Sequence, residues 1–257
     1  MPKISFTLDS SWKNLNRVGA FAALIAALVF RRNLGAEATM FVGPVPTTAV
    51  GWFTLLHNNS LLGLFFLNFF DIADYVLVGL VFLALYIALR KTNRIYSGIA
   101  TSLSLAGILV YVISTTSFTM LSLSSQYASA ATDAQKSALL AAAQAVLAKG
   151  IPGADYQGVG GLTSLFLIAV AGLIISVVML RGKIFNRITA YVGITASALD
   201  LAYLSGLAFL PAGAFYLGSI LLIGGAGLLL MIWHLLIGVK LYKLSVTPIS
   251  AGVKNNE

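Results

Sequence analysis

The chain has 257 residues, of which 59% are hydrophobic and only 9% are charged, and its mean hydropathy is +0.93. Soluble domains carry about 25% charged residues, so this composition excludes an ordinary soluble fold and predicts that lipid is the main solvent. The net charge of +8 would suggest nucleic acid in a soluble protein. Here the basic residues gather in short loops beside apolar segments, so we expect no nucleic-acid binding.

Six apolar segments predict the fold class. A helix needs about 20 apolar residues to cross the hydrocarbon core of a membrane, and these segments meet or approach that length. We therefore expect an all-α, polytopic transmembrane bundle of about six helices that forms a single integral membrane domain over residues 1–257. The predicted spans are 15–30, 61–89, 95–121, 162–180, 188–210 and 214–239.

The first predicted span is the shortest, and two interpretations of it stay open. Its apolar run could belong to a cleaved signal peptide, with Ala36-Glu37-Ala38 as the cleavage site. However, Arg31 and Arg32 stand between the apolar run and that site, and Arg17 precedes the run. Long basic side chains at both ends of a short helix can extend to the two membrane surfaces, so the pattern favours a retained helix.

The distribution of basic residues predicts the orientation of the bundle. If the N-terminus is cytoplasmic, twelve of the sixteen Lys and Arg residues fall on the cytoplasmic side, as the positive-inside rule requires. An even number of spans then places the C-terminus on the same side. The expected location is the cell membrane of a prokaryote, with both termini cytoplasmic and the lipid bilayer as the main partner. The twelve residues are Lys3, Lys13, Arg17, Arg90, Lys91, Arg94, Arg181, Lys183, Arg187, Lys240, Lys243 and Lys254.

The longest loop joins the third and fourth predicted spans and carries a helix signature. Thr132 and Gln135 have the spacing of a capping box, and apolar residues then recur at helical spacing up to Leu147. We predict an external amphipathic helix over 132–149 that lies on the membrane or over the mouth of the bundle. A spacer is favoured over a ligand lid as its role.

Acidic residues inside apolar segments are the candidate functional residues. Asp71 and Asp74 lie in the second predicted span, Asp200 lies in the fifth, and Tyr203 lies one helical turn beyond Asp200. A charged side chain at the membrane centre costs roughly 2.5–3.5 kcal/mol, so such a residue must be paired, protonated or exposed to water. Asp74, Asp200, Asp71 and Tyr203 are therefore candidate ligand-binding residues, with helix packing as the alternative role. The hydroxyl groups of 114–117 could join the acids in lining an outward-facing polar pocket.

The sequence contains no signature of a catalytic or cofactor site. The metalloprotease, serine-hydrolase and phosphate-loop motifs are missing. The chain has no cysteine, and its two histidines, His57 and His234, are far apart in sequence. We therefore expect no cofactor, no catalytic residue and no resident metal. Three functions stay open: binding or transport of a small polar ligand or cation, a lipid-active intramembrane enzyme, and a structural or signalling membrane partner.

Part of the chain resembles a known family. The similar segments are 116–121, 126–136, 141–148 and 185–194, and the family is a group of prokaryotic multi-pass membrane proteins known only as a domain of unknown function. The resemblance covers most of the chain and implies a six-helix membrane fold, but it supplies no activity. Members of that family commonly carry an acid where Gln144 stands here, which argues against an essential carboxylate at this position.

Overall fold

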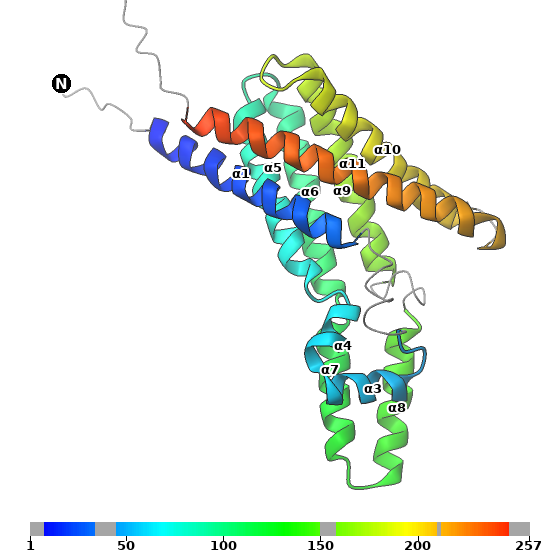
Figure 1. The fold of residues 1–257 in the computed structure, drawn as a ribbon. Coiled ribbons are helices and arrows are strands. Elements are labelled where there is room, and N and C mark those ends of the chain that lie inside the picture. Colours follow the sequence, from blue (N-terminus) through cyan, green and yellow to red (C-terminus); the bar gives the residue numbers. More distant parts are fainter. Residues whose placement is uncertain (1–7, 34–44, 150–157, 210–211, 247–257) are drawn as a thin grey trace, which may run out of the picture.

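The chain folds into an all-α bundle with a smaller group of helices at one end (Figure 1). This computed structural model describes residues 8–33, 45–149, 158–209 and 212–246, and within those ranges it contains no strand. The longer helices form the bundle: α1 (Leu8–Asn33), α5 (Asp71–Leu89), α6 (Arg94–Ser114), α9 (Gly158–Arg181), α10 (Arg187–Phe209) and α11 (Ala212–Val246). The shorter helices form what we call the helical module: α3 (Ala49–Asn58), α4 (Ser60–Phe66), α7 (Ser117–Ser129) and α8 (Asp133–Leu147).

Helices of membrane-crossing length are the main feature of the bundle. Within the described residues, five segments are long and apolar enough to cross a membrane, so the chain is an α-helical membrane protein. These segments are Asp71–Leu89, Arg94–Ser129, Gly158–Arg181, Arg187–Leu207 and Gly224–Val246. They correspond to the second to sixth predicted spans. The first predicted span lies in α1, whose side chains over 29–33 are outside the described set, so its crossing of the membrane stays a prediction.

Helix α1 packs as a full member of the bundle. It lies antiparallel beside α11 and also contacts α5 (Figure 1). Small residues permit this close approach: a Cβ on Gly19 would clash with Ala84 of α5, and one on Gly238 of α11 would lie 2.9 Å from Leu24. The opposite face of α1 exposes Val18, Phe21, Ile25 and Leu28, as a lipid-facing helix should. This packing favours a retained helix, although the proposed cleavage site at 36–38 lies outside the described residues.

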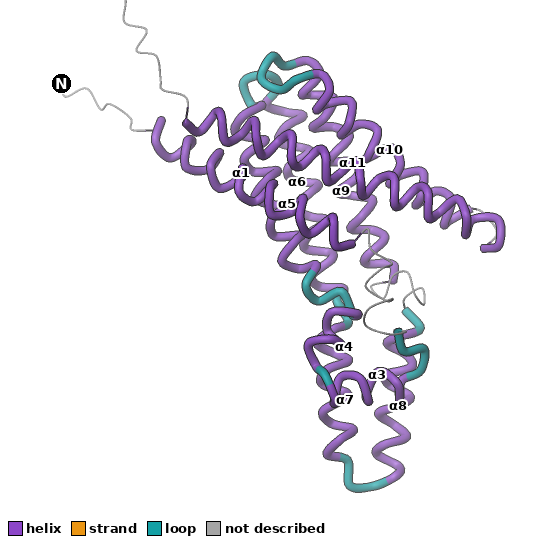
Figure 2. Tube along the Cα trace, viewed as in Figure 1, coloured by secondary structure: helices purple, strands orange, loops and turns teal. Residues whose placement is uncertain are grey.

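The second predicted span is interrupted, which corrects the sequence-based boundaries. Helix α4 ends at Phe66, and a turn precedes the start of α5 at Asp71 (Figure 2). Asn68 in this turn has a φ of 59°, a conformation in which asparagine is more common than most residues. The hydroxyl of Ser117 donates a 2.7 Å hydrogen bond to the carbonyl of Leu67 and holds the turn against α7. The segment 61–66 therefore belongs to the module instead of the bundle.

The third predicted span is also divided. Helix α6 ends at Ser114, Thr115 has an extended backbone with ψ at 132°, and α7 begins at Ser117. Helix α7 then carries the chain away from the bundle into the module (Figure 1).

The helical module has an apolar core of its own. Helices α7 and α8 form an antiparallel hairpin, and α3 packs across both of them (Figure 1). The core consists of Ala49, Trp52, Phe53, Leu56, Leu67, Met120 and Ala143.

The capping box predicted for α8 is confirmed. Thr132 Oγ1 accepts a 3.2 Å hydrogen bond from the Gln135 amide, and Gln135 Oε1 accepts one of 3.2 Å from the Thr132 amide. The apolar stripe of α8, with Leu140, Ala143 and Val146, faces the module core. This stripe is therefore buried by α3 and α7. The predicted position of α8 relative to the membrane stays a prediction.

The two ends of the bundle differ in charge. The start of α1, the end of α11, and the α5–α6 and α9–α10 turns lie at one end, opposite the module (Figure 1). Most basic residues of the bundle lie on the segments at that end, whereas Arg31 and Arg32 stand at the other end of α1. At the basic end, the Arg90 guanidinium lies 4.2 Å from the centre of the Trp12 ring. The assignment of this basic end to the cytoplasm stays a prediction.

Candidate functional site

Asp71 and Asp74 lie in the first turn of α5, where the sequence had placed them inside a continuous span. A helix N-terminus stabilises negative side chains, because its free backbone amides carry partial positive charge. Asp71 is partly exposed, and the Tyr111 hydroxyl lies 3.4 Å from its Oδ2 and 3.3 Å from the Asn68 carbonyl oxygen. Asp74 is only 5% exposed. In the first turn, both carboxylates can stabilise the start of α5. In the middle of a span they could not have this role.

The side chains of Arg31 and Arg32 lie outside the described set, so no contact between them and Asp71 is described. Tyr75, one helical turn after Asp71 in α5, stacks on Tyr111 of α6 with ring centres 3.8 Å apart. The two tyrosines therefore link the start of α5 to α6 next to the turn that leads into the module.

Asp200 is the one predicted acid that lies well inside a long helix. It is 6% exposed, and Tyr203, one turn further along α10, is also buried. Ser197 occupies the same face of α10, and a Cβ on Gly172 of α9 would lie 2.6 Å from its hydroxyl. This face therefore packs against α9. Among the described residues, no hydrogen bond or ion pair to Asp200 is found.

The structure does not gather the candidate acids around one cavity. Helix α5 packs mainly against α1 and α6, whereas α10 packs against α9 and α11. No broad interface joins α5 to α10, so Asp74 and Asp200 belong to different helix pairs. Within the described residues, no group of three or more His, Asp or Glu side chains is placed to hold a metal ion.

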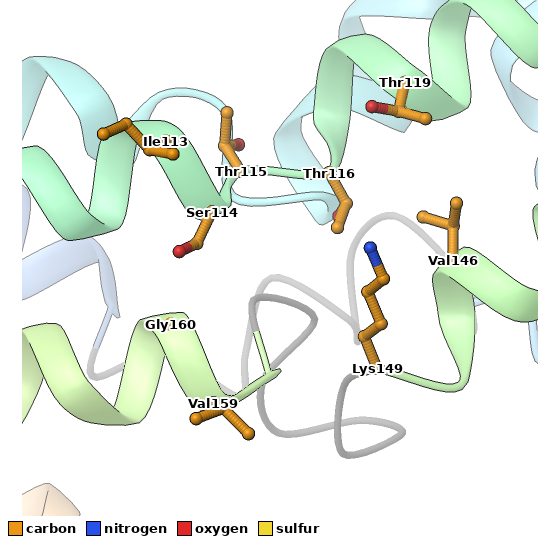
Figure 3. Close-up of a pocket in the computed structure, with 9 residues that line it drawn as sticks. All are labelled: Ile113, Ser114, Thr115, Thr116, Thr119, Val146, Lys149, Val159 and Gly160. Carbon is orange, nitrogen blue, oxygen red and sulfur yellow. The ribbon is translucent and has the colours of Figure 1, made fainter.

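A cavity of about 430 Å³ lies where the bundle meets the module (Figure 3). None of the four predicted site residues lines it. Its walls come from the end of α6, the start of α7, the end of α8 and the start of α9. The lining residues are Ile113, Ser114, Thr115, Thr116, Thr119, Val146, Lys149, Val159 and Gly160. Of the hydroxyl-bearing residues 114–117, the cavity is lined by Ser114, Thr115 and Thr116. The candidate acids, which were expected to line the same pocket, do not line it.

Close backbone approaches give the cavity its shape. Gly160 lies against the Ser114 hydroxyl, so that any side chain at 160 would displace it. Gly158 has a φ of 61°, a left-handed conformation that favours glycine, and its position against the Lys149 carbonyl leaves no room for a Cβ. These two glycines allow α9 to begin beside both the end of α6 and the end of α8.

Lys149 is the charged residue among the described residues that line the cavity. Its side chain extends from the end of α8 into the cavity, and its amine points toward the gap between Ser114 and Thr116 (Figure 3). The sequence alone did not single out Lys149 as a functional residue. Its hydroxyl-bearing neighbours lie some thirty positions earlier in the chain and Gly160 lies beyond the next loop, so only the fold could reveal the group.

The lining determines the chemistry that the cavity can support. The described lining residues offer one primary amine and several hydroxyl groups as hydrogen-bond donors, and none of them is a carboxylate or an imidazole. Such a set can bind and orient a polar ligand.

Comparisons with models of protein families, with curated proteins and with solved structures find no match. The resemblance of this chain to a prokaryotic family of multi-pass membrane proteins therefore stays a prediction.

Proposed function

We propose that this protein is a membrane-embedded binding protein that holds a small polar ligand in the cavity between its bundle and its helical module. The observation that supports this function is the cavity of about 430 Å³ into which the Lys149 amine projects toward Thr116, with Ser114 also in the lining. Ligand sites commonly have volumes of roughly 300–1,000 Å³ and few polar groups that fix orientation.

Binding is favoured over passage of the ligand through the membrane. The bundle core contains large, almost fully buried side chains that pack together, among them Phe82, Leu85, Trp233 and Ile237. Interiors packed in this way leave few voids larger than a water molecule. Binding is also favoured over lipid hydrolysis, because the described lining residues supply no carboxylate or imidazole to move a proton.

We place the cavity on the outer side of the cell membrane. This orientation is supported by the basic residues at the opposite end of the bundle, which the positive-inside rule assigns to the cytoplasm. A ligand would then reach the cavity from outside the cell.

A substitution that fills the cavity tests the proposed function. Thr119 lines the cavity and is exposed, so Thr119→Trp would occupy ligand space without disturbing a buried contact. Ser125→Trp on the exposed surface of the same helix is the matched control. Purified parent and variants would be screened by thermal shift against phosphates, short-chain phospholipids, sugars, amino acids and simple cations.

We expect at least one ligand class to raise the melting temperature of the parent and of Ser125→Trp but not that of Thr119→Trp. If no compound shifts the parent, or if all three proteins shift equally, the cavity is not a ligand site. A structural or signalling role for the module would then be the better interpretation.

A further inference from the structure

We infer that the ligand carries a phosphate group, and that this group is the headgroup phosphate of an anionic membrane lipid held by Lys149. The inference rests on the proposed function and names the chemical class of its ligand. It depends on three observations: the charge of the cavity, its apolar rim and its level relative to the membrane.

The charge of the cavity selects for an anion. Among the described lining residues, Lys149 is the one ionisable group, and its amine is directed into the cavity (Figure 3). Within the described residues, Lys149 forms no ion pair. A lysine amine can bind a phosphate as a point charge, and neighbouring hydroxyls can donate to the remaining phosphate oxygens. The hydroxyls of Ser114, Thr116 and Thr119 stand on the facing wall.

The rim of the cavity is strongly apolar on the side of the bundle. Ile113 near the end of α6 is 80% exposed, and Val159 near the start of α9 is 79% exposed. Both residues line the cavity. A phosphate alone would leave these side chains uncovered, whereas the acyl chains of a lipid would cover them, because apolar surface is stabilised by removal from water.

The cavity also lies at the level expected for lipid headgroups. Helix α6 has 21 residues, which at about 1.5 Å per residue corresponds to roughly 30 Å, the thickness of the hydrocarbon core. Ser114 is the last residue of α6, so the hydroxyls and Lys149 lie just beyond the apolar layer. Lys149, Thr116 and Thr119 on the module side and the exposed Ile113 and Val159 on the bundle side match the two parts of a phospholipid.

The test uses the full chain, purified in a non-ionic detergent and freed of bound lipid. Affinity would be measured by thermal shift at low ionic strength for three probes: dihexanoyl phosphatidylglycerol, inorganic phosphate, and octyl glucoside as an uncharged amphiphile. The variants are Lys149→Ala and Lys149→Arg. Lys136→Ala is the matched control, because Lys136 lies on the same helix but does not line the cavity.

We expect the parent to bind phosphatidylglycerol most tightly. Lys149→Ala should weaken this binding by about tenfold or more, since hydrogen bonds to ionised groups are the stronger class. Lys149→Arg should keep it within a few-fold, and Lys136→Ala should leave it unchanged. Unliganded melting temperatures of the three variants would establish that each is folded.

The other outcomes separate the inference from the proposed function. If inorganic phosphate binds as tightly as phosphatidylglycerol and competes with it, the ligand is a free phosphate and the lipid assignment is wrong. If octyl glucoside binds equally well and Lys149→Ala has no effect, the phosphate assignment is overturned while the cavity remains a ligand site. If no probe binds and Thr119→Trp also has no effect in the ligand screen, both proposals fail.

Discussion

Gly19 lies where α1 meets α5, and a Cβ at this position would clash with the Cβ of Ala84. An alanine side chain cannot rotate away, so Gly19→Ala would force the two helices apart. We expect a loss of about 1–3 kcal/mol of stability, which is typical of overpacking. Gly224 of α11 is the matched control, because a Cβ there would meet nothing within 4 Å.

Thermal unfolding of the two purified variants checks this prediction. Gly19→Ala should melt below the parent, and Gly224→Ala should melt at or slightly above it, since alanine favours helix over glycine by about 1 kcal/mol. Equal melting of Gly19→Ala and the parent would mean that α1 does not pack in the bundle. The signal-peptide interpretation of the first apolar segment would then regain support.

Asp200 combines deep burial in a bundle helix with the absence, among the described residues, of a hydrogen bond or ion pair. Burying an amide in apolar surroundings costs less than burying a carboxylate. We therefore expect Asp200→Asn to stabilise the protein, by at most the roughly 2.5–3.5 kcal/mol that insertion scales assign to an acid in mid-membrane. Asp71→Asn should change little, because Asp71 is partly exposed and an amide oxygen can still face Tyr111.

Melting curves of both asparagine variants, with and without sodium or calcium, test this expectation. A less stable Asp200→Asn would show that the carboxylate makes a favourable contact. If the parent also gains stability from a cation and the variant does not, Asp200 would be a cation ligand, as the sequence alone suggested.

At the scale of elements, α8 depends on a local cap and on packing against its neighbours. Replacing Thr132 with Ala removes the side-chain acceptor for the Gln135 amide, which should cost about 1 kcal/mol. Amide hydrogen exchange across 135–148 should therefore become faster. Ser137→Ala is the control, since Ser137 is exposed on the same helix and has no capping role. Unchanged exchange in Thr132→Ala would contradict the contribution of the cap.

The interruption of the second span has a tertiary cause. Hydropathy over 61–89 is continuous, so nothing in the apolar pattern requires a break. The break is stabilised by contacts distant in sequence, such as the bond from Ser117 to the Leu67 carbonyl, fifty positions apart. Helix α4 then finds its apolar partners in α3 and α7.

At the scale of the whole molecule, the start of α1 and the end of α11 lie at the same end of the bundle (Figure 1). Because the chain has no native cysteine, single cysteines report position cleanly. We expect cysteines replacing Lys13, Lys183 and Lys243 to resist a membrane-impermeant reagent in intact cells. A cysteine replacing Lys136 in the module should react.

Permeabilised cells provide the control, because all four positions should react there. If the cysteine at 136 alone is protected in intact cells, the orientation is inverted. If those at 13 and 243 differ, α1 does not cross the membrane and the bundle has an odd number of spans.

The sequence by itself determined the fold class, five membrane-length helices and the capping box of α8. These features depend on composition, on the length of apolar runs and on residues three or four positions apart, all of which are local. The same local pattern placed Asp71 and Asp74 inside a span, because hydropathy could not show that α5 begins at Asp71.

Only the tertiary structure decided which residues meet. The module core joins α3 and α4 to α7 and α8 across some fifty to ninety positions, and the cavity joins residues 113–119 to Lys149 and Gly160. Hydroxyls, a lysine and glycines are common residues, and no spacing in the sequence distinguishes those that line a cavity. Their selection depends on helix approach, which close contacts such as that of Gly160 with Ser114 allow.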